Sequence, residues 1–126
     1  MTQNRELGDL GENISARYLV SKGYEIILQN YAKPWGEIDI IAKHGEIVVF
    51  VEVKSSKKKS EGAFNPELRA DLVKLNKVIK TAMLFLEYEL KSQDTQWRVD
   101  VISVIFDDIR EKANITHFKN AGEAWS

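Results

Sequence analysis

The sequence predicts an α/β domain in which helices flank a mixed central β-sheet. Three observations support this fold class. A hairpin of apolar residues spans Gly36–Lys54, a second Val- and Ile-rich segment spans Trp97–Phe106, and a helical repeat of apolar residues precedes each of them. The chain has 126 residues, 44% of them apolar, and no repeat or linker divides it. We therefore expect residues 1–126 to form one domain with a single core.

The first element is predicted to be a helix over about Asn4–Ser21, which Gly23 is placed to end. Its apolar stripe consists of Leu7, Leu10, Ile14, Tyr18 and Leu19. Glu12 lies off this stripe, so its ordinary interpretation is a solvated helix residue. Tyr24–Tyr31 is then predicted to be the first strand. Trp35 follows in a break, where it either stacks on a base or caps the end of the sheet.

The hairpin carries four charged side chains among its apolar residues. Its two arms are rich in Ile, Val and Phe, and a polar turn at residues 43–45 separates them. Because side chains alternate between the two faces of a strand, Glu37 and Asp39 share one face of the first arm. Glu52 and Lys54 share one face of the second arm. Three carboxylates and an ammonium group are therefore predicted on two adjacent strands.

The apolar neighbours of these charges indicate that the strands are buried. Removing ionised side chains from water costs free energy unless they find a partner. One solution is an edge ion pair between Glu52 and Lys54, with Glu37 and Asp39 at a solvated strand end. The other is a metal ion. Carboxylates in a chain without cysteine form a hard oxygen site that suits Mg²⁺ or Mn²⁺. Asp39 lies thirteen positions before Glu52 on the preceding strand, and this spacing favours the metal.

The second half of the chain predicts a loop, a long helix and two strands. Residues 55–62 have no apolar anchor, which predicts a mobile loop. Asn65 can cap a helix that continues to Leu86. Trp97–Phe106 is predicted to be a strand packed by that helix, and Ile115–Phe118 a short edge strand.

The net charge of −1 and the pI near 6.1 argue against a protein that coats nucleic acid through bulk charge. From Lys54 to Lys80, however, seven lysines and one arginine face three acids, a local net charge of 8 − 3 = +5. Such a patch is typical of phosphate contacts. The candidate contacts are Lys57, Lys58, Lys59, Lys74 and Arg98. The alternatives are solubility for the lysine run and an ion pair with Asp100 for Arg98.

The residues Gly36-Glu-Ile-Asp-Ile-Ile-Ala42 and Phe50-Val-Glu-Val-Lys54 resemble the YraN-like family. This is an uncharacterised bacterial family described as predicted endonucleases, distantly similar to Holliday junction resolvases. The resemblance extends to Leu7-Gly-Asp-Leu-Gly-Glu-Asn-Ile-Ser-Ala16 and Arg98-Val-Asp-Val-Ile102, so it covers nearly the whole chain. Asp, a spacer and Glu-x-Lys on a hairpin is the pattern of restriction-endonuclease-like nucleases.

The resemblance implies a restriction-endonuclease-like core and a Mg²⁺-dependent DNA endonuclease, with Mn²⁺ as a substitute ion. Asp39 and Glu52, assisted by the carbonyl of Val53, would hold the ion. Lys54 would orient or deprotonate the attacking water, or stabilise the transition state. Two further acids are second-rank candidates for the metal site, Glu12 as a ligand or water-orienting group and Glu37 as a ligand.

Substrates and partners follow from the resolvase resemblance alone. It suggests branched or damaged DNA, and a homodimer is a secondary expectation because resolvases that cut paired strands are two-fold dimers. No apolar segment approaches the roughly 20 residues that span a bilayer, so no membrane contact and a cytoplasmic location are expected. The competing interpretation is a non-catalytic nucleic-acid-binding or interaction module that retains the nuclease fold.

Overall fold

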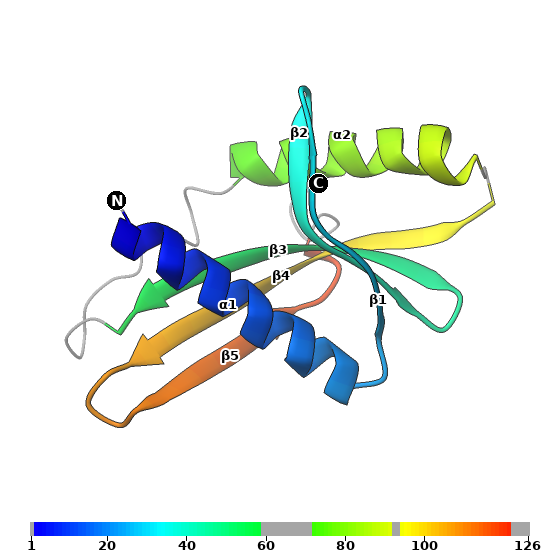
Figure 1. The fold of residues 1–126 in the computed structure, drawn as a ribbon. Coiled ribbons are helices and arrows are strands. Elements are labelled where there is room, and N and C mark those ends of the chain that lie inside the picture. The colour runs from blue at the N-terminus through cyan, green and yellow to red at the C-terminus, as the bar shows by residue number, and fades with distance from the viewer. Residues whose placement is uncertain (1, 59–71, 92–93, 122–126) are drawn as a thin grey trace.

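The computed structural model describes residues 2–58, 72–91 and 94–121. The elements in chain order are α1 (Thr2–Ser21), β1 (Glu25–Lys33), β2 (Gly36–His44), β3 (Ile47–Lys57), α2 (Leu72–Phe85), a π-helical turn η2 (Leu86–Leu90), β4 (Gln96–Asp107) and β5 (Lys112–Phe118). The strands form one sheet in the order β1-β2-β3-β4-β5 (Figure 1). The predicted elements are therefore present in the predicted order.

The sheet is mixed because one of its strand pairs is parallel. β1, β2 and β3 pair antiparallel through short turns, as do β4 and β5, whereas β3 and β4 run parallel. A parallel pair needs a long crossover connection, and the segment that contains α2 provides it. This arrangement confirms the predicted α/β class and is consistent with a restriction-endonuclease-like core.

The two helices cover opposite faces of the sheet (Figure 1). The core under α2 includes Ile38, Ile41, Phe50, Val78, Ala82 and Phe85. The core under α1 includes Ala16, Leu19, Ile40, Val49, Val51 and Ile102. Burial on both faces explains why β2, β3 and β4 have nearly continuous apolar sequences.

The buried face of α1 differs from the predicted stripe. Leu10 is 50% exposed, whereas Glu12, which was expected in solvent, is only 8% exposed. The reason is a close approach to β3, since a Cβ atom on Gly11 would overlap Ser55 Oγ. Gly11 and the fully buried Ser15 let the backbone of α1 reach the sheet, and this contact turns Glu12 inward.

The predicted loop after Lys54 is wrong for its first residues. β3 continues through Ser55 and Ser56 to Lys57, and these residues pair with β4 from Val104 to Phe106. The strand ladder with β4 stabilises extended structure that the polar composition did not indicate. The predicted helix start at Asn65 lies outside the described residues. Within the described ranges, no helix has the length and apolar composition needed to cross a membrane.

Candidate active site

The predicted site lies where β2 and β3 separate. The two strands pair between Ile40–Val51 and the turn, whereas β2 before Ile40 pairs with β1 alone. Beyond the last pair, the main-chain N–H of Val53 donates a hydrogen bond of 2.8 Å to Asp39 Oδ2. The Asp39 side chain therefore takes the place of a strand partner, which fixes it against β3.

Glu52 is the centre of a cluster of charged side chains. Its side chain is buried, and Glu52 Oε1 lies 2.7 Å from Lys74 Nζ and 3.8 Å from Lys54 Nζ. Burial and the charge of Asp39 raise the pKa of Glu52 to about 7, although the two lysines partly offset this. Asp39, whose Oδ2 accepts the N–H of the neighbouring Val53, therefore lies near Glu52 on the adjacent strand.

Glu12 adds a third carboxylate to the cluster, from α1. Glu12 Oε1 is buried and has no hydrogen-bond partner among the described residues. Burial, and then the charges of Asp39 and Asp9, raise the pKa of Glu12 to about 7. A buried oxygen without a donor is costly, so this atom is available to a ligand.

Burial also raises the pKa of Asp39. The hydrogen bond from Val53 and the charges of Lys74 and Lys54 lower this pKa, but burial outweighs them. All three carboxylates therefore resist ionisation, chiefly because burial removes them from water. Fully ionised, Glu12, Asp39 and Glu52 contribute −3 and the two lysines +2, a net charge of −1. Perturbed acids that converge in this way are typical of functional sites.

The donor atoms suit a divalent cation in kind. Carboxylate oxygens are the ligands that Mg²⁺ prefers, and Glu12 Oε1 lacks a protein partner within the described residues. No group of three or more His, Cys, Asp or Glu in residues 2–58, 72–91 and 94–121 is arranged to hold a metal ion. Mg²⁺ usually keeps several waters and uses one or two carboxylates, so Asp39 and Glu52 fit a partly hydrated ion.

The remaining predicted site residues of the hairpin lie further out. Glu37 is exposed, and its charge contributes to the raised pKa of Asp39. Lys57 Nζ lies 3.9 Å from Asp108 Oδ2, and Lys58 Nζ lies 3.5 Å from Asp107 Oδ2. Lys59 lies outside the described residues. The contact between these lysines and phosphate stays a prediction.

Arg98 belongs to a buried network rather than to the acidic cluster. Arg98 Nε donates to Asp100 Oδ1 at 2.9 Å, and Arg98 Nη2 donates to the Tyr24 hydroxyl at 2.7 Å. His117 Nε2 lies 2.7 Å from Asp100 Oδ2, and His117 Nδ1 lies 3.0 Å from the Tyr18 hydroxyl. With its side chain 15% exposed, Arg98 forms the ion pair with Asp100 that was the alternative interpretation of this residue, and its phosphate contact stays a prediction.

Lys74 is the residue whose place the sequence did not reveal. Its predicted role was a phosphate contact from the flank of the long helix, whereas its Nζ is bound to Glu52. Burial alone would lower the pKa of Lys74, but its hydrogen bond to Glu52 and the charges of Glu52 and Asp39 raise it. Only the β3–α2–β4 crossover brings together residues that are 22 positions apart, so no local spacing signals the pair.

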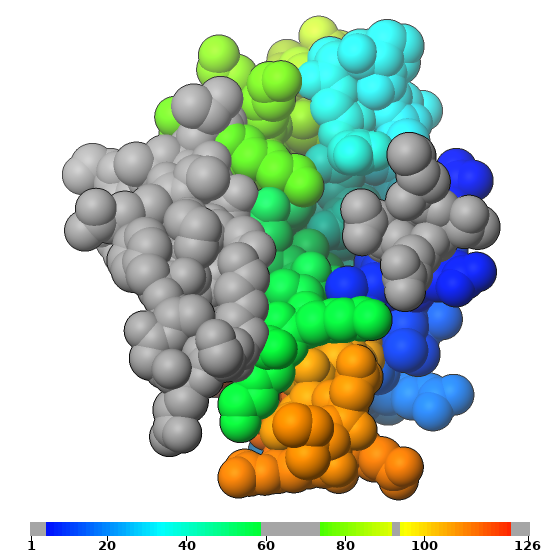
Figure 2. All heavy atoms as spheres, turned by 90° about the vertical axis from the view of Figure 1, so that its left-hand side faces the viewer, coloured from blue at the N-terminus to red at the C-terminus, as the bar shows by residue number. Residues whose placement is uncertain are grey.

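The surface around the second half of β3 is shown in Figure 2. Side chains of β3 (green) reach the surface between α2 and β2 above them, α1 (blue) at one side and the end of β4 (orange) below. The second half of β3 therefore reaches this face of the molecule, between α2 and α1.

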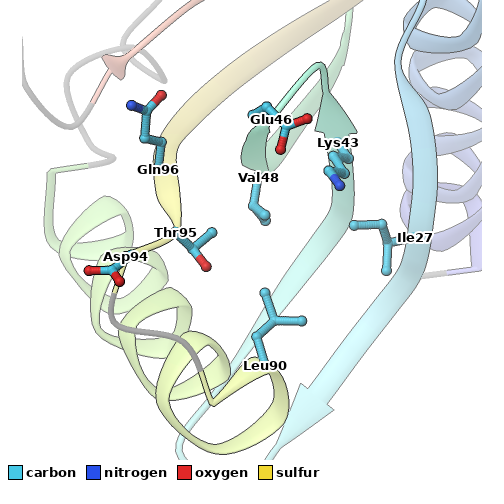
Figure 3. Close-up of a pocket in the computed structure, with 8 residues that line it drawn as sticks. All are labelled: Ile27, Lys43, Glu46, Val48, Leu90, Asp94, Thr95 and Gln96. Carbon is cyan, nitrogen blue, oxygen red and sulfur yellow. The ribbon is translucent and has the colours of Figure 1, made fainter.

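A separate pocket of about 510 Å³ lies at the opposite end of β3 (Figure 3). Ile27, Val48 and Leu90 form its apolar wall, and Lys43, Glu46, Asp94, Thr95 and Gln96 complete the lining. Its acids are exposed, and none of the predicted site residues contributes to it. The pocket and the acidic cluster are therefore distinct.

We expect Glu12→Gln to stabilise the protein at pH 8 and to have little effect below about pH 4.5. The folded protein holds the Glu12 proton with a pKa of about 7, against an ordinary 4.5, so unfolding free energy falls as pH rises through this window. A neutral side chain removes the buried charge, and we expect a gain of about 1 to 2 kcal/mol at pH 8. Urea denaturation between pH 4 and 8 without divalent ions measures it.

The control for this prediction is Glu6→Gln, which changes an exposed glutamate of the same helix in the same way. It should leave the pH dependence of stability unchanged. Because the pKa of Glu52 is raised in the same direction, Glu12→Gln should reduce the slope without abolishing it. Equal pH profiles for wild type and Glu12→Gln would contradict the raised pKa.

Comparison with known proteins gives one consistent family. The model of a family described as "Uncharacterised protein family UPF0102" matches residues 11–104. A UPF0102 protein of Fervidobacterium nodosum is 38% identical over 94% of this chain and 84% of its own length. A UPF0102 protein of Clostridium tetani is 36% identical over 94% of both chains. One of Syntrophus aciditrophicus is 40% identical over 82% of this chain and 80% of its own.

Proposed function

This chain belongs to the uncharacterised protein family UPF0102, and on that premise we propose that it is a Mg²⁺-dependent DNA endonuclease. The resemblance to the YraN-like family is thereby confirmed, but the family description names no activity. The proposal rests on one observation. Where β2 and β3 separate, Asp39 accepts the N–H of Val53, next to Glu52, and Lys54 Nζ lies 3.8 Å from Glu52 Oε1.

Asp39 and Glu52 would hold the ion, with the Val53 carbonyl as a further oxygen donor and Glu12 as the water-orienting group that the family resemblance implies. Bound Mg²⁺ would supply charge neutralisation at the phosphate and a lower pKa for an attacking water. The protein's own part is to keep the carboxylates in place before the ion arrives. The Val53 N–H does this for Asp39, and the burial of Glu52 limits its rotamers.

The lysines would act on the phosphodiester. Lys54 is placed to orient or deprotonate water or to stabilise the transition state. Lys74, whose side chain is 48% exposed, would provide a second positive charge for a phosphate oxygen. A bound divalent ion would add two positive charges to the cluster and so favour the approach of a phosphodiester.

A second candidate function is a nucleic-acid-binding module without catalysis. The observation that favours it is the Lys74–Glu52 ion pair of 2.7 Å, which partly neutralises Glu52 without a metal. In that case the acidic cluster would join α2 to β3, and exposed lysines would provide the affinity for phosphate. For either function we propose that the protein is cytoplasmic and that its partner is DNA, in particular branched or damaged DNA. A homodimer would place two copies on two paired strands.

Calorimetric titration with Mn²⁺ separates the two candidate functions. Wild type should bind the ion with measurable heat at pH 7.5, and Asp39→Ala should not. Both proteins are then assayed on linear, nicked, flapped and four-way DNA in Mg²⁺ and in EDTA. Equal and negligible heats for wild type and variant, with no Mg²⁺-dependent product, would overturn the endonuclease and leave the binding module.

A further inference from the structure

We propose that Trp35 stacks on an unpaired base of the substrate and thereby directs this protein to DNA in which single strands adjoin duplex. The inference deepens the proposed endonuclease function, on which it rests, by naming a residue that selects the substrate. Three features carry it: the shape of the β1–β2 hairpin, the support beneath that hairpin and the exposure of Trp35.

The first step is the shape of the β1–β2 hairpin. Its outer part, residues 31–39, is called the arm here. Within the arm β2 pairs with β1 alone, because pairing of β2 with β3 begins only at Ile40. Figure 1 shows this hairpin rising beyond the edge of β3. The arm thus leaves the sheet at Asp39, and its tip is the turn at Pro34 and Trp35.

The second step is that the arm is held rather than free. Gly36 lies against α2, where a Cβ atom would overlap Oγ1 of the buried Thr81. At the base of the arm, the rings of Tyr31 and Phe85 pack edge to face with centroids 5.3 Å apart. Contacts at both ends fix the arm against α2, so Trp35 has a defined position.

The third step is the exposure of Trp35 itself. It is 54% exposed, so more than half of its surface is open to a ligand. Its indole lies at the tip of the arm, and Lys33, whose ammonium lies 5.6 Å from the Tyr31 ring centroid, adds a positive charge to the same arm. Single-stranded nucleic acid offers an unpaired base for stacking and a phosphate that attracts such a charge.

The fourth step relates Trp35 to the site of cleavage. Asp39 lies four positions after Trp35 in extended chain, a span of about 13 Å. This corresponds to a few nucleotides along a strand. Paired bases hide their faces in the duplex stack, whereas an unpaired base offers its face without regard to sequence. Trp35 therefore selects unpaired bases a few nucleotides from the scissile phosphate.

The test measures cleavage of a linear duplex and of the same duplex with a single-stranded flap, in Mg²⁺. The variants are Trp35→Ala, Trp35→Phe, and Tyr88→Ala as the matched control. Tyr88 is an aromatic residue in η2 that is 63% exposed. Trp35→Ala should lower the ratio of flap to duplex kcat/KM about 5- to 150-fold, the range for loss of one stacked base. Trp35→Phe should keep most of the ratio, and Tyr88→Ala all of it.

An unchanged ratio in Trp35→Ala, or an equal loss in Tyr88→Ala, would overturn the inference and point to a protein partner for Trp35. Thermal unfolding confirms that each variant is folded. The same proteins are also compared for binding to labelled flap and duplex DNA in EDTA. If wild type cleaves nothing, the endonuclease proposal fails alone, and a flap-specific loss of affinity in Trp35→Ala still supports the stacking inference.

Discussion

Asp39→Asn and Glu52→Gln should each lower Mg²⁺-dependent DNA cleavage about a thousandfold. Loss of the ion would remove about 4 kcal/mol of transition-state stabilisation, and each 1.36 kcal/mol corresponds to a factor of ten. Initial rates on the best substrate, at saturating Mg²⁺, measure the effect. The two losses should not add in the double variant, because both variants remove the same ion.

The substitutions are chosen to keep the fold. Asp39→Asn retains a side-chain oxygen that can accept the Val53 N–H, and Glu52→Gln removes a buried charge with little change in side-chain volume. Glu46→Gln is the matched control, because it neutralises an exposed acid in the turn of the same hairpin. It should retain wild-type cleavage. Wild-type activity in Asp39→Asn, with folding intact, would exclude the proposed metal site.

Asp100→Ala should lower the free energy of unfolding by about 3 to 5 kcal/mol, the usual cost of removing one partner of a buried ion pair. Asp100 is fully buried and accepts hydrogen bonds from Arg98, from His117 and from the main-chain N–H of Asn120. Its removal leaves the Arg98 guanidinium inside the protein without its anion. Urea denaturation at pH 7 measures the loss.

Two controls make this second prediction specific. Asp108→Ala removes an aspartate whose side chain is 76% exposed, so it should change stability by less than about 0.5 kcal/mol. Hydrogen bonds from His117, Arg98 and Asn120 outweigh burial and lower the pKa of Asp100. The wild-type advantage over Asp100→Ala should therefore be complete above the ordinary pKa of 3.8 and decline as the pH falls below it. A constant difference down to about pH 2 would contradict this.

The central hairpin was predictable because its information is local. Alternation and the apolar runs place Asp39, Glu52 and Lys54 on adjacent strands, and β2 and β3 follow closely the predicted arms. The turn lies at Gly45 and Glu46, slightly later than predicted, because His44 pairs with Ile47. Strand periodicity specifies which side chains share a face, and a short turn specifies which strands are neighbours.

The burial of Glu12 could not be predicted from residues close to it in sequence. The periodicity of α1 predicted a stripe through Leu10 and left Glu12 in solvent, but helix periodicity does not say which stripe meets the sheet. Gly11 decides this, because a Cβ atom there would overlap Ser55 and keep the helix backbone away from β3. Ser55 itself is in a strand because β4 pairs with it, although its neighbours are polar.

The sequence by itself determined the order of the elements, the burial of the central strands and the placement of Asp39, Glu52 and Lys54 on adjacent strands. Each of these depends on residues that are close in the chain. The tertiary structure alone decided that Glu12 and Lys74 join those residues, that Arg98 serves Asp100, and that the arm leaves the sheet at Asp39. These features depend on packing between elements far apart in sequence. A buried charge is stable only next to an opposite charge or a hydrogen-bond partner, and two backbones approach closely only where the residues are small.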